Sequence, residues 1–171
     1  METFWNSFIS GVNVVIRRAK EQDVSRIAEI LVFVKRMKYR DIFHNDEFSF
    51  GELQVLTVAK QYLECCESND SDSRPIRILD NIWVYDDGIV KGLIHIEDNE
   101  VVELYVDYFF WGEGVGSALL KFAIKEFGVD RLWVLEKNAD AIAFYKAHGF
   151  SDSGEKRFAE GTEEIEILLA R

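Results

Sequence analysis

The chain has 171 residues, of which 48% are apolar and 13% aromatic, a composition that excludes a disordered protein and predicts one globular domain. Its formal net charge of −11 argues against sequence-independent binding to nucleic acid, which requires a basic surface. The same charge favours cationic small molecules or basic peptides as ligands, although ordinary solubility accounts for it equally well.

The N-terminal segment METFWNSFISGVNVVIRR lacks the basic start and the sustained apolar core of a secretory signal. No apolar run reaches the roughly 18 residues that a membrane-spanning helix needs. We therefore expect a cytoplasmic protein with no membrane partner. Residues 1–11 are predicted to be an N-terminal extension, and residues 12–171 a single domain.

The first part of that domain is predicted to contain a strand and two helices. VNVVIRRA (12–19) is apolar and β-branched, which favours a strand. Apolar residues then recur at helical spacing over 20–43 and again over 53–67. The second helix would carry the adjacent Cys65 and Cys66 on its face, as reduced thiols rather than a disulfide.

The remainder alternates short strands with helices. Asp-Asp-Gly at 86–88 is a strong hairpin signal within a predicted antiparallel meander, because glycine supplies the positive φ of a tight turn. The elements predicted after the meander are a helix at 116–128, a strand at 130–136, a helix at 138–149 and a strand at 163–170. The strand–turn–helix–strand order over 101–135 indicates one right-handed parallel crossover, so the domain is predicted to be α+β with a mixed sheet.

A glycine-rich turn, FFWGEGVGSALL (109–120), connects a predicted strand to a predicted helix. Such a turn leaves backbone N–H groups unpaired at the positive end of the helix dipole, which makes an anion site. Two familiar phosphate loops do not fit. The Walker pattern needs Gly-Lys-Ser/Thr, which is absent, and the dinucleotide fingerprint fails because Ser117 stands in the place of its third glycine.

A third pattern fits both this turn and a segment further along. VVELYVDYFFWGEGVGSALL resembles the acyl-CoA-binding segment of the GNAT superfamily of N-acetyltransferases, a strand followed by R/Q-x-x-G-x-G/A and a helix. It departs from the pattern at Trp111, which replaces Arg or Gln, and it lacks the proline common after the strand. NADAIAFYKAHGF resembles the second GNAT signature, N-x-x-A-x-x-F-Y-x-x-x-G-F.

The resemblance implies a fold and a cosubstrate. The fold is a mostly antiparallel mixed sheet of about six to seven strands, flanked by about four helices, with two splayed central parallel strands. The cosubstrate is acetyl-CoA, and no metal is implied; the histidines and cysteines show no metal spacing. The cofactor-binding residues carried over are Leu104, Val106, Trp111, Gly112, Gly114, Val115, Gly116, Ser117, Asn138 and Tyr145. For Asn138, capping of the following helix is an equal alternative.

Two residues are candidates for catalysis. Tyr145 matches the superfamily tyrosine that protonates the leaving thiolate; alternatively it is a core aromatic beside Phe144. Glu103 is a carboxylate within an apolar strand, where partial burial suits a general base that acts directly or through water. Simple alternation places Glu103 on one face with Val101 and Tyr105. Its alternative is solvent, or an ion pair with Arg or Lys on the neighbouring strand.

The acceptor pocket is expected near Tyr39, His44 and Asp46, which lie between the first two helices; a solvated loop is the alternative. The resemblance implies N-acetylation of a primary amine on a small molecule. The alternatives are acetylation of a protein lysine or N-terminus, and a non-catalytic acyl-CoA-binding module. A homodimer through exposed aromatics such as Phe109, Phe110 or Trp111 is a further expectation from the resemblance.

Overall fold

The computed structural model describes residues 5–9, 12–43, 54–66 and 76–171. Eight strands form one mixed sheet in the order β1-β2-β5-β6-β7-β8-β10-β9. The strands are β1 (Trp5–Ile9), β2 (Val12–Arg18), β5 (Ile82–Asp86), β6 (Val90–Glu97), β7 (Glu100–Val106), β8 (Arg131–Leu135), β9 (Ser151–Phe158) and β10 (Ile165–Ala170). The fold class predicted from the sequence is confirmed.

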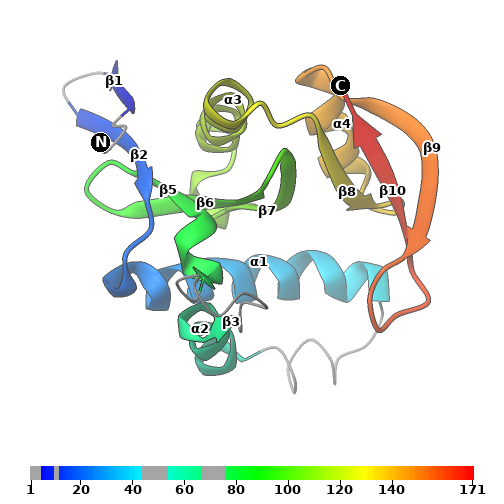
Figure 1. Cartoon of the computed structure of the whole chain (residues 1–171), viewed down its shortest axis with the longest axis horizontal. Coiled ribbons are helices and arrows are strands. Elements are labelled where there is room, and N and C mark those ends of the chain that lie inside the picture. Colours follow the sequence, from blue (N-terminus) through cyan, green and yellow to red (C-terminus); the bar gives the residue numbers. More distant parts are fainter. Residues whose placement is uncertain (1–4, 10–11, 44–53, 67–75) are drawn as a thin grey trace.

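Helices cover both faces of the sheet (Figure 1). On one face lie α1 (Val24–Phe43) and α2 (Val55–Leu63), and on the other α3 (Val115–Phe127) and α4 (Ala139–Ala147). Each face has its own apolar core. Ile27 and Leu31 of α1 are buried in one, and Leu119 and Phe122 of α3 in the other. The sheet is thus held between two cores, which fixes the ends of its central strands.

Some elements differ from the sequence predictions. The predicted second helix ends at Leu63, and Cys65–Cys66 form strand β3, which pairs with β4 (Ile76–Arg77) in a small second sheet. The placement of the cysteines on a helix face is therefore wrong. Residues 5–9 of the expected extension form β1 and pair with β2. The domain boundary at residue 12 stays a prediction.

Strand β9 is the other element that the sequence did not signal. It pairs with β10 at the edge of the sheet, and all eight of its residues are exposed. An edge strand without a buried face carries no period-two pattern of apolar residues, so nothing in its sequence announces it.

The central strands β7 and β8 are parallel and splayed, as expected. They pair only at their beginnings, Glu100 with Arg131 and Val101 with Leu132. A register shift between β6 and β7 leaves Val102 as an extra residue in β7, directly after the last paired position. Because a bulge bends its strand and ends regular pairing, it accounts for the divergence of β7 from β8 beyond this point.

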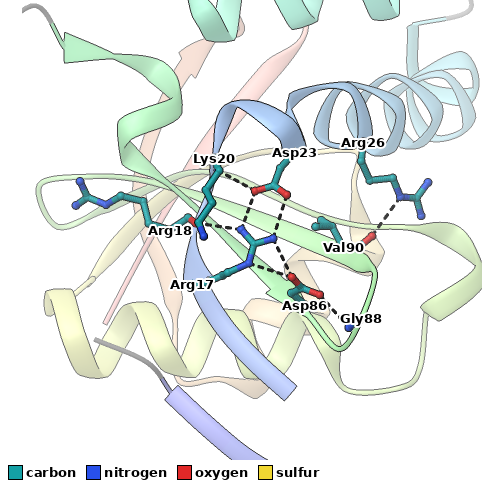
Figure 2. Close-up of polar contacts among 8 residues, drawn as sticks. All are labelled: Arg17, Arg18, Lys20, Asp23, Arg26, Asp86, Gly88 and Val90. Carbon is teal, nitrogen blue, oxygen red and sulfur yellow. Dashed lines mark hydrogen bonds and ion pairs between the residues drawn. The ribbon is translucent and has the colours of Figure 1, made fainter. Parts of the chain in front are cut away.

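An ion-pair network holds the start of α1 against the sheet (Figure 2). The guanidinium of Arg17 in β2 lies between Asp23 and Asp86, 2.7 Å from one carboxylate and 2.8 Å from the other. Asp23 ends the 3₁₀ turn η1 (Glu21–Asp23) and also accepts a hydrogen bond from the Lys20 backbone N–H. Burial alone would raise the pKa of Asp23, but these hydrogen bonds outweigh it and the pKa lies below its usual value.

Candidate active site

A cleft of about 620 Å³ opens where β7 and β8 diverge. Its walls come from the two strands, the glycine turn after β7, the first turns of α4, and one face of α1. The structure brings together the following predicted site residues in its lining: Glu103, Leu104, Val106, Trp111, Gly112, Gly114, Val115, Gly116, Ser117, Asn138 and Tyr145. Residues as far apart in the sequence as Glu103 and Tyr145 thus meet in one cavity.

The glycine turn presents backbone donors to this cleft. Gly112 and Gly114 have φ values of 81° and 84°, which side chains rarely tolerate. The first hydrogen bond of α3 runs from the Ala118 N–H to the Gly114 carbonyl. Within the described residues, the N–H groups from Gly114 to Ser117 have no acceptor. Together with the helix dipole, they can bind an anion such as a phosphate group.

The third glycine of the turn has a different reason to be there. A Cβ on Gly116 would lie 3.5 Å from both Phe144 and Val106, which is ordinary contact. Backbone conformation therefore demands glycine at the two earlier positions, whereas Gly116 is not forced by a clash. The tightest approach involves Gly92 of β6, where a Cβ would come within 2.9 Å of the Tyr105 carbonyl and 3.0 Å of Val115.

His148, at the end of α4, ties the two signature segments together. Its Nδ1 lies 2.8 Å from the Phe144 carbonyl oxygen and its Nε2 lies 3.1 Å from Ser117 Oγ. Since a carbonyl only accepts, Nδ1 carries a proton and donates it, and the Ser117 hydroxyl is hydrogen-bonded to Nε2. The Ser117 side chain is thus engaged with α4, and its backbone N–H remains available to the cleft.

Asp107 anchors the start of the turn, where a proline is common in the resembling family. Its carboxylate accepts a hydrogen bond from the Phe109 N–H at 3.1 Å, and Arg26 of α1 forms an ion pair with it. Its own N–H donates to the Lys91 carbonyl of β6. This buried aspartate therefore fixes the turn to both β6 and α1.

Backbone groups of β7 face the open side of the strand. Because Asp107 N–H points to β6, the alternating backbone groups of Leu104 and Val106 point away from β6, into the cleft. The Trp111 indole donates to the Val106 carbonyl at 2.7 Å and packs against Tyr108, with ring centroids 5.1 Å apart. Trp111 therefore covers the end of the exposed strand edge.

Glu103 faces α1 and α2. Its two carboxylate oxygens accept from Lys35 Nζ at 3.0 Å and from the Tyr62 hydroxyl at 2.6 Å. The expected alternative of a basic partner is thus realised, but from a helix rather than from the neighbouring strand. Burial, followed by the negative charge of Glu103, raises the pKa of Tyr62 well above its usual value, so Tyr62 remains a donor.

The bulge at Val102 corrects the predicted faces of β7. Val101 was expected on the same face as Glu103, but it is buried in the core beneath α3 with Leu104 and Val106. Glu103 and Tyr105 stay on the α1 side, where Lys35 Nζ lies 5.5 Å from the Tyr105 ring. The alternation rule fails here because the extra residue shifts it by one position.

Tyr145 and Asn138 reach the cleft from α4 and its first turn. Tyr145 is 8% exposed and packs edge-on against Phe144 and Phe150, so it belongs to the core and to the cleft wall at once. The Asn138 side chain accepts from the Ala141 N–H at 3.3 Å and caps α4, the alternative foreseen for it.

The expected acceptor residues cannot be compared with the structure. Tyr39 belongs to α1, but its side chain, like all of His44 and Asp46, lies outside the described residues. Among the described residues, Val34, Lys35 and Lys38 of α1 line the cleft. Their signal in the sequence is slight, because two lysines in a long helix are usually read as a solvated face.

Two kinds of feature are absent among the residues the structure describes. No cluster of three or more His, Cys, Asp or Glu side chains is arranged to hold a metal ion. No helix in the described ranges is both long and apolar enough to cross a membrane.

Comparisons with known proteins agree with the geometry. Residues 79–152 match the family described as Acetyltransferase (GNAT) domain. YjaB from Escherichia coli has a similar fold, with 20% identity and a TM-score of 0.69 over 92% of this chain and 96% of its own. An N-acetyltransferase from Staphylococcus aureus Mu50 is 15% identical, with a TM-score of 0.67 over 90% of this chain and 98% of its own. The paia N-acetyltransferase from Thermoplasma acidophilum, solved with coenzyme A, is 18% identical. Its TM-score is 0.56 over 92% of this chain and 99% of its own.

Proposed function

Because the chain is a member of the GNAT superfamily of acyl-CoA-dependent N-acyltransferases, we propose that it transfers the acetyl group of acetyl-CoA to a primary amine on a small molecule. One observation carries the proposal. The cleft between β7 and β8 joins a set of unpaired backbone N–H groups at the glycine turn to a carboxylate, Glu103, on its α1 side.

The binding of the cosubstrate rests on backbone groups. The N–H groups of Gly112, Gly114, Val115, Gly116 and Ser117 hold the pyrophosphate of CoA. The backbone of Leu104 and Val106 binds the pantetheine amide and polarises the thioester carbonyl, and Asn138 lines the same channel. Trp111 flanks the same channel, and its indole N–H donates a hydrogen bond to the Val106 carbonyl. A coenzyme A complex in the paia N-acetyltransferase, which has a similar fold, supports this placement.

The reaction needs three proton transfers. Glu103 accepts a proton from the acceptor ammonium, directly or through a water, using a lone pair that its two hydrogen bonds leave free. The neutral amine attacks the thioester carbon, a C–N bond forms, and the C–S bond breaks. Tyr145 donates its phenolic proton to the departing thiolate, and the excess proton of the new amide nitrogen restores the phenol through solvent. Lys35 and Tyr62 hold the Glu103 carboxylate in place.

The acceptor could also belong to a protein, as a lysine or an N-terminus, or transfer could be absent in a CoA-binding module. A small amine is favoured because the side chains of α1 close over the cleft, with Lys35 on Glu103 and Lys38 on Asp140. We place the reaction in the cytoplasm. A homodimer would use Phe109, whose side chain is 76% exposed beside the turn.

An assay of thiol release tests the proposal. We expect acetyl-CoA to bind with micromolar affinity and CoA to be released when small primary amines are added, each acetylated product being identified by mass. Binding without transfer to any small amine, but with transfer to peptides, supports the protein-acetylation alternative. Binding without transfer to either class leaves the non-catalytic module.

A further inference from the structure

Two lysines of α1 form ion pairs with different walls of the cleft. Lys35 is paired with Glu103 of β7, whereas Lys38 is paired with Asp140 of α4 at 2.7 Å. Lys38 also lies over the Trp111 ring, 4.9 Å from its centroid. Three residues apart, the lysines share one face of the helix, and both line the cleft.

The two ion pairs differ in how easily a ligand can open them. The Lys35 and Glu103 side chains are 22% and 18% exposed, and Tyr62 holds the same carboxylate. By contrast, the Asp140 side chain is 83% exposed, so it can leave Lys38 and be solvated by water at little cost. Exposed pairs of this kind contribute little to stability, because water screens the charges and the side chains lose conformational freedom. Lys38 is thus the charge that can change partners.

Each charged side chain in the cleft lining forms an ion pair with a side chain of opposite charge. Besides these two pairs, the lining contains Glu166, which Arg157 holds at 2.8 Å. An amine with a single positive charge would bring a further ammonium next to Lys35 and Lys38. An amine that also carries a carboxylate brings no net charge, and its carboxylate can replace Asp140 on Lys38. The whole-chain charge of −11 therefore does not describe the field at this wall.

We propose that the acceptor is a small amino acid, an amine that also carries a carboxylate, and that Lys38 determines this specificity by binding the carboxylate. The proposal rests on the proposed function. Glu103 and Lys38 line the same cleft, so the acceptor's ammonium can face Glu103 while its carboxylate faces Lys38.

Matched acceptors test the proposal. The free L-amino acids and β-alanine are compared with their carboxamides at saturating acetyl-CoA. We expect the wild-type protein to favour the free acids by at least tenfold in kcat/KM, mainly through KM. Lys38→Met should remove this preference, and Lys38→Arg should keep most of it. Lys60→Met, which removes an exposed lysine of α2 outside the cleft lining, should leave the preference unchanged.

A variant of the competing carboxylate separates binding from mere structural support. If Asp140 competes with the acceptor for Lys38, Asp140→Asn should lower KM for the free acids severalfold and leave KM for the carboxamides unchanged. A structural role for the pair predicts equal losses for both acceptor classes.

Several results would overturn the proposal. One is a wild-type protein that accepts carboxamides or simple amines as well as the acids. Another is a Lys38→Met variant that retains the preference or loses activity on both classes equally. Transfer to simple amines but to no amino acid overturns this inference alone. No transfer to any amine, with acetyl-CoA still bound in a calorimetric titration, overturns the proposed transfer to small amines as well.

Discussion

The two sides of the cleft are built from different parts of the chain. The glycine-turn side consists of backbone N–H groups held by positive φ angles and by the first turn of α3. The α1 side consists of long charged side chains, Lys35, Lys38 and Glu103, joined across elements by ion pairs. Backbone donors bind a part that every acyl-CoA shares, whereas exchangeable side chains suit a variable acceptor. Changes on the α1 side should therefore leave acetyl-CoA affinity intact.

The largest expected effect on the α1 side comes from Glu103→Gln. It removes the proposed base while keeping the size of the side chain, so kcat should fall ~10³-fold. Steady-state kinetics measure the loss, and calorimetry should show unchanged acetyl-CoA affinity.

A matched control is Glu166→Gln, because Glu166 lines the same cleft, is paired with Arg157, and has a 21% exposed side chain against 18% for Glu103. It should retain most of the activity. Equal losses for the two variants would assign Glu103 a general electrostatic role rather than proton transfer.

Tyr145→Phe tests the opposite side of the cleft. The change removes one hydroxyl and little packing, so kcat should fall ~10²-fold through loss of the proton donor. Acetyl-CoA affinity should change little. Tyr85→Phe is the control, since Tyr85 is also 8% exposed but lies in β5 outside the cleft lining. An unchanged turnover number in Tyr145→Phe rules out the acid role.

Tyr62→Phe should have a smaller effect on the α1 side. It removes a 2.6 Å hydrogen bond to Glu103 but leaves the ion pair with Lys35. A bond of this kind contributes about 1 kcal/mol, so we expect a loss in kcat of about fivefold with KM unchanged. A loss as large as that of Glu103→Gln, measured in the same assay, would show that Tyr62 takes part in the chemistry itself.

Asp23→Asn should change stability and leave catalysis nearly intact. Loss of the pair with Arg17 should lower the free energy of unfolding by about 2 kcal/mol at neutral pH, measured by urea denaturation. The folded-state pKa of Asp23 is depressed, so its contribution is present above about pH 3.9 and is lost as the pH falls through the folded-state value. The difference from wild type should therefore shrink in acid.

Asp98→Asn, an exposed residue of the β6–β7 turn, should be nearly neutral by the same measurement. A cost for Asp23→Asn that stays constant down to pH 2 would contradict the depressed pKa and assign the effect to packing.

The backbone-built side could be predicted from the sequence for a physical reason. A turn that requires φ near 80° at Gly112 and Gly114 leaves glycines in the sequence, and a helix start follows directly. The Asn138 cap and the buried Tyr145 likewise belong to one short helix. Each of these features depends on neighbours close in sequence, so local patterns carry them.

The α1 side of the cleft, which is built from side chains, could not be predicted in the same way. Lys35 and Tyr62 reach Glu103 across 68 and 41 residues of sequence, and no local pattern records such contacts. The bulge at Val102 also escaped the alternation rule, because a bulge depends on the register of two strands. A basic partner for Glu103 was predicted on the neighbouring strand, whereas the structure places it on α1.

The most direct test of the central claim, that acetyl-CoA lies on the glycine turn, is calorimetric titration of wild type, Gly114→Ala and Gly154→Ala. The φ angles of Gly114 and Gly154 are 84° and 85°, and no atom lies within 4 Å of a Cβ at either position. Both substitutions thus carry the same backbone strain, about 1–2 kcal/mol. We predict micromolar binding by wild type and Gly154→Ala, and about tenfold weaker binding by Gly114→Ala. Equal affinities in all three proteins, or equal losses in the two variants, would contradict the claim.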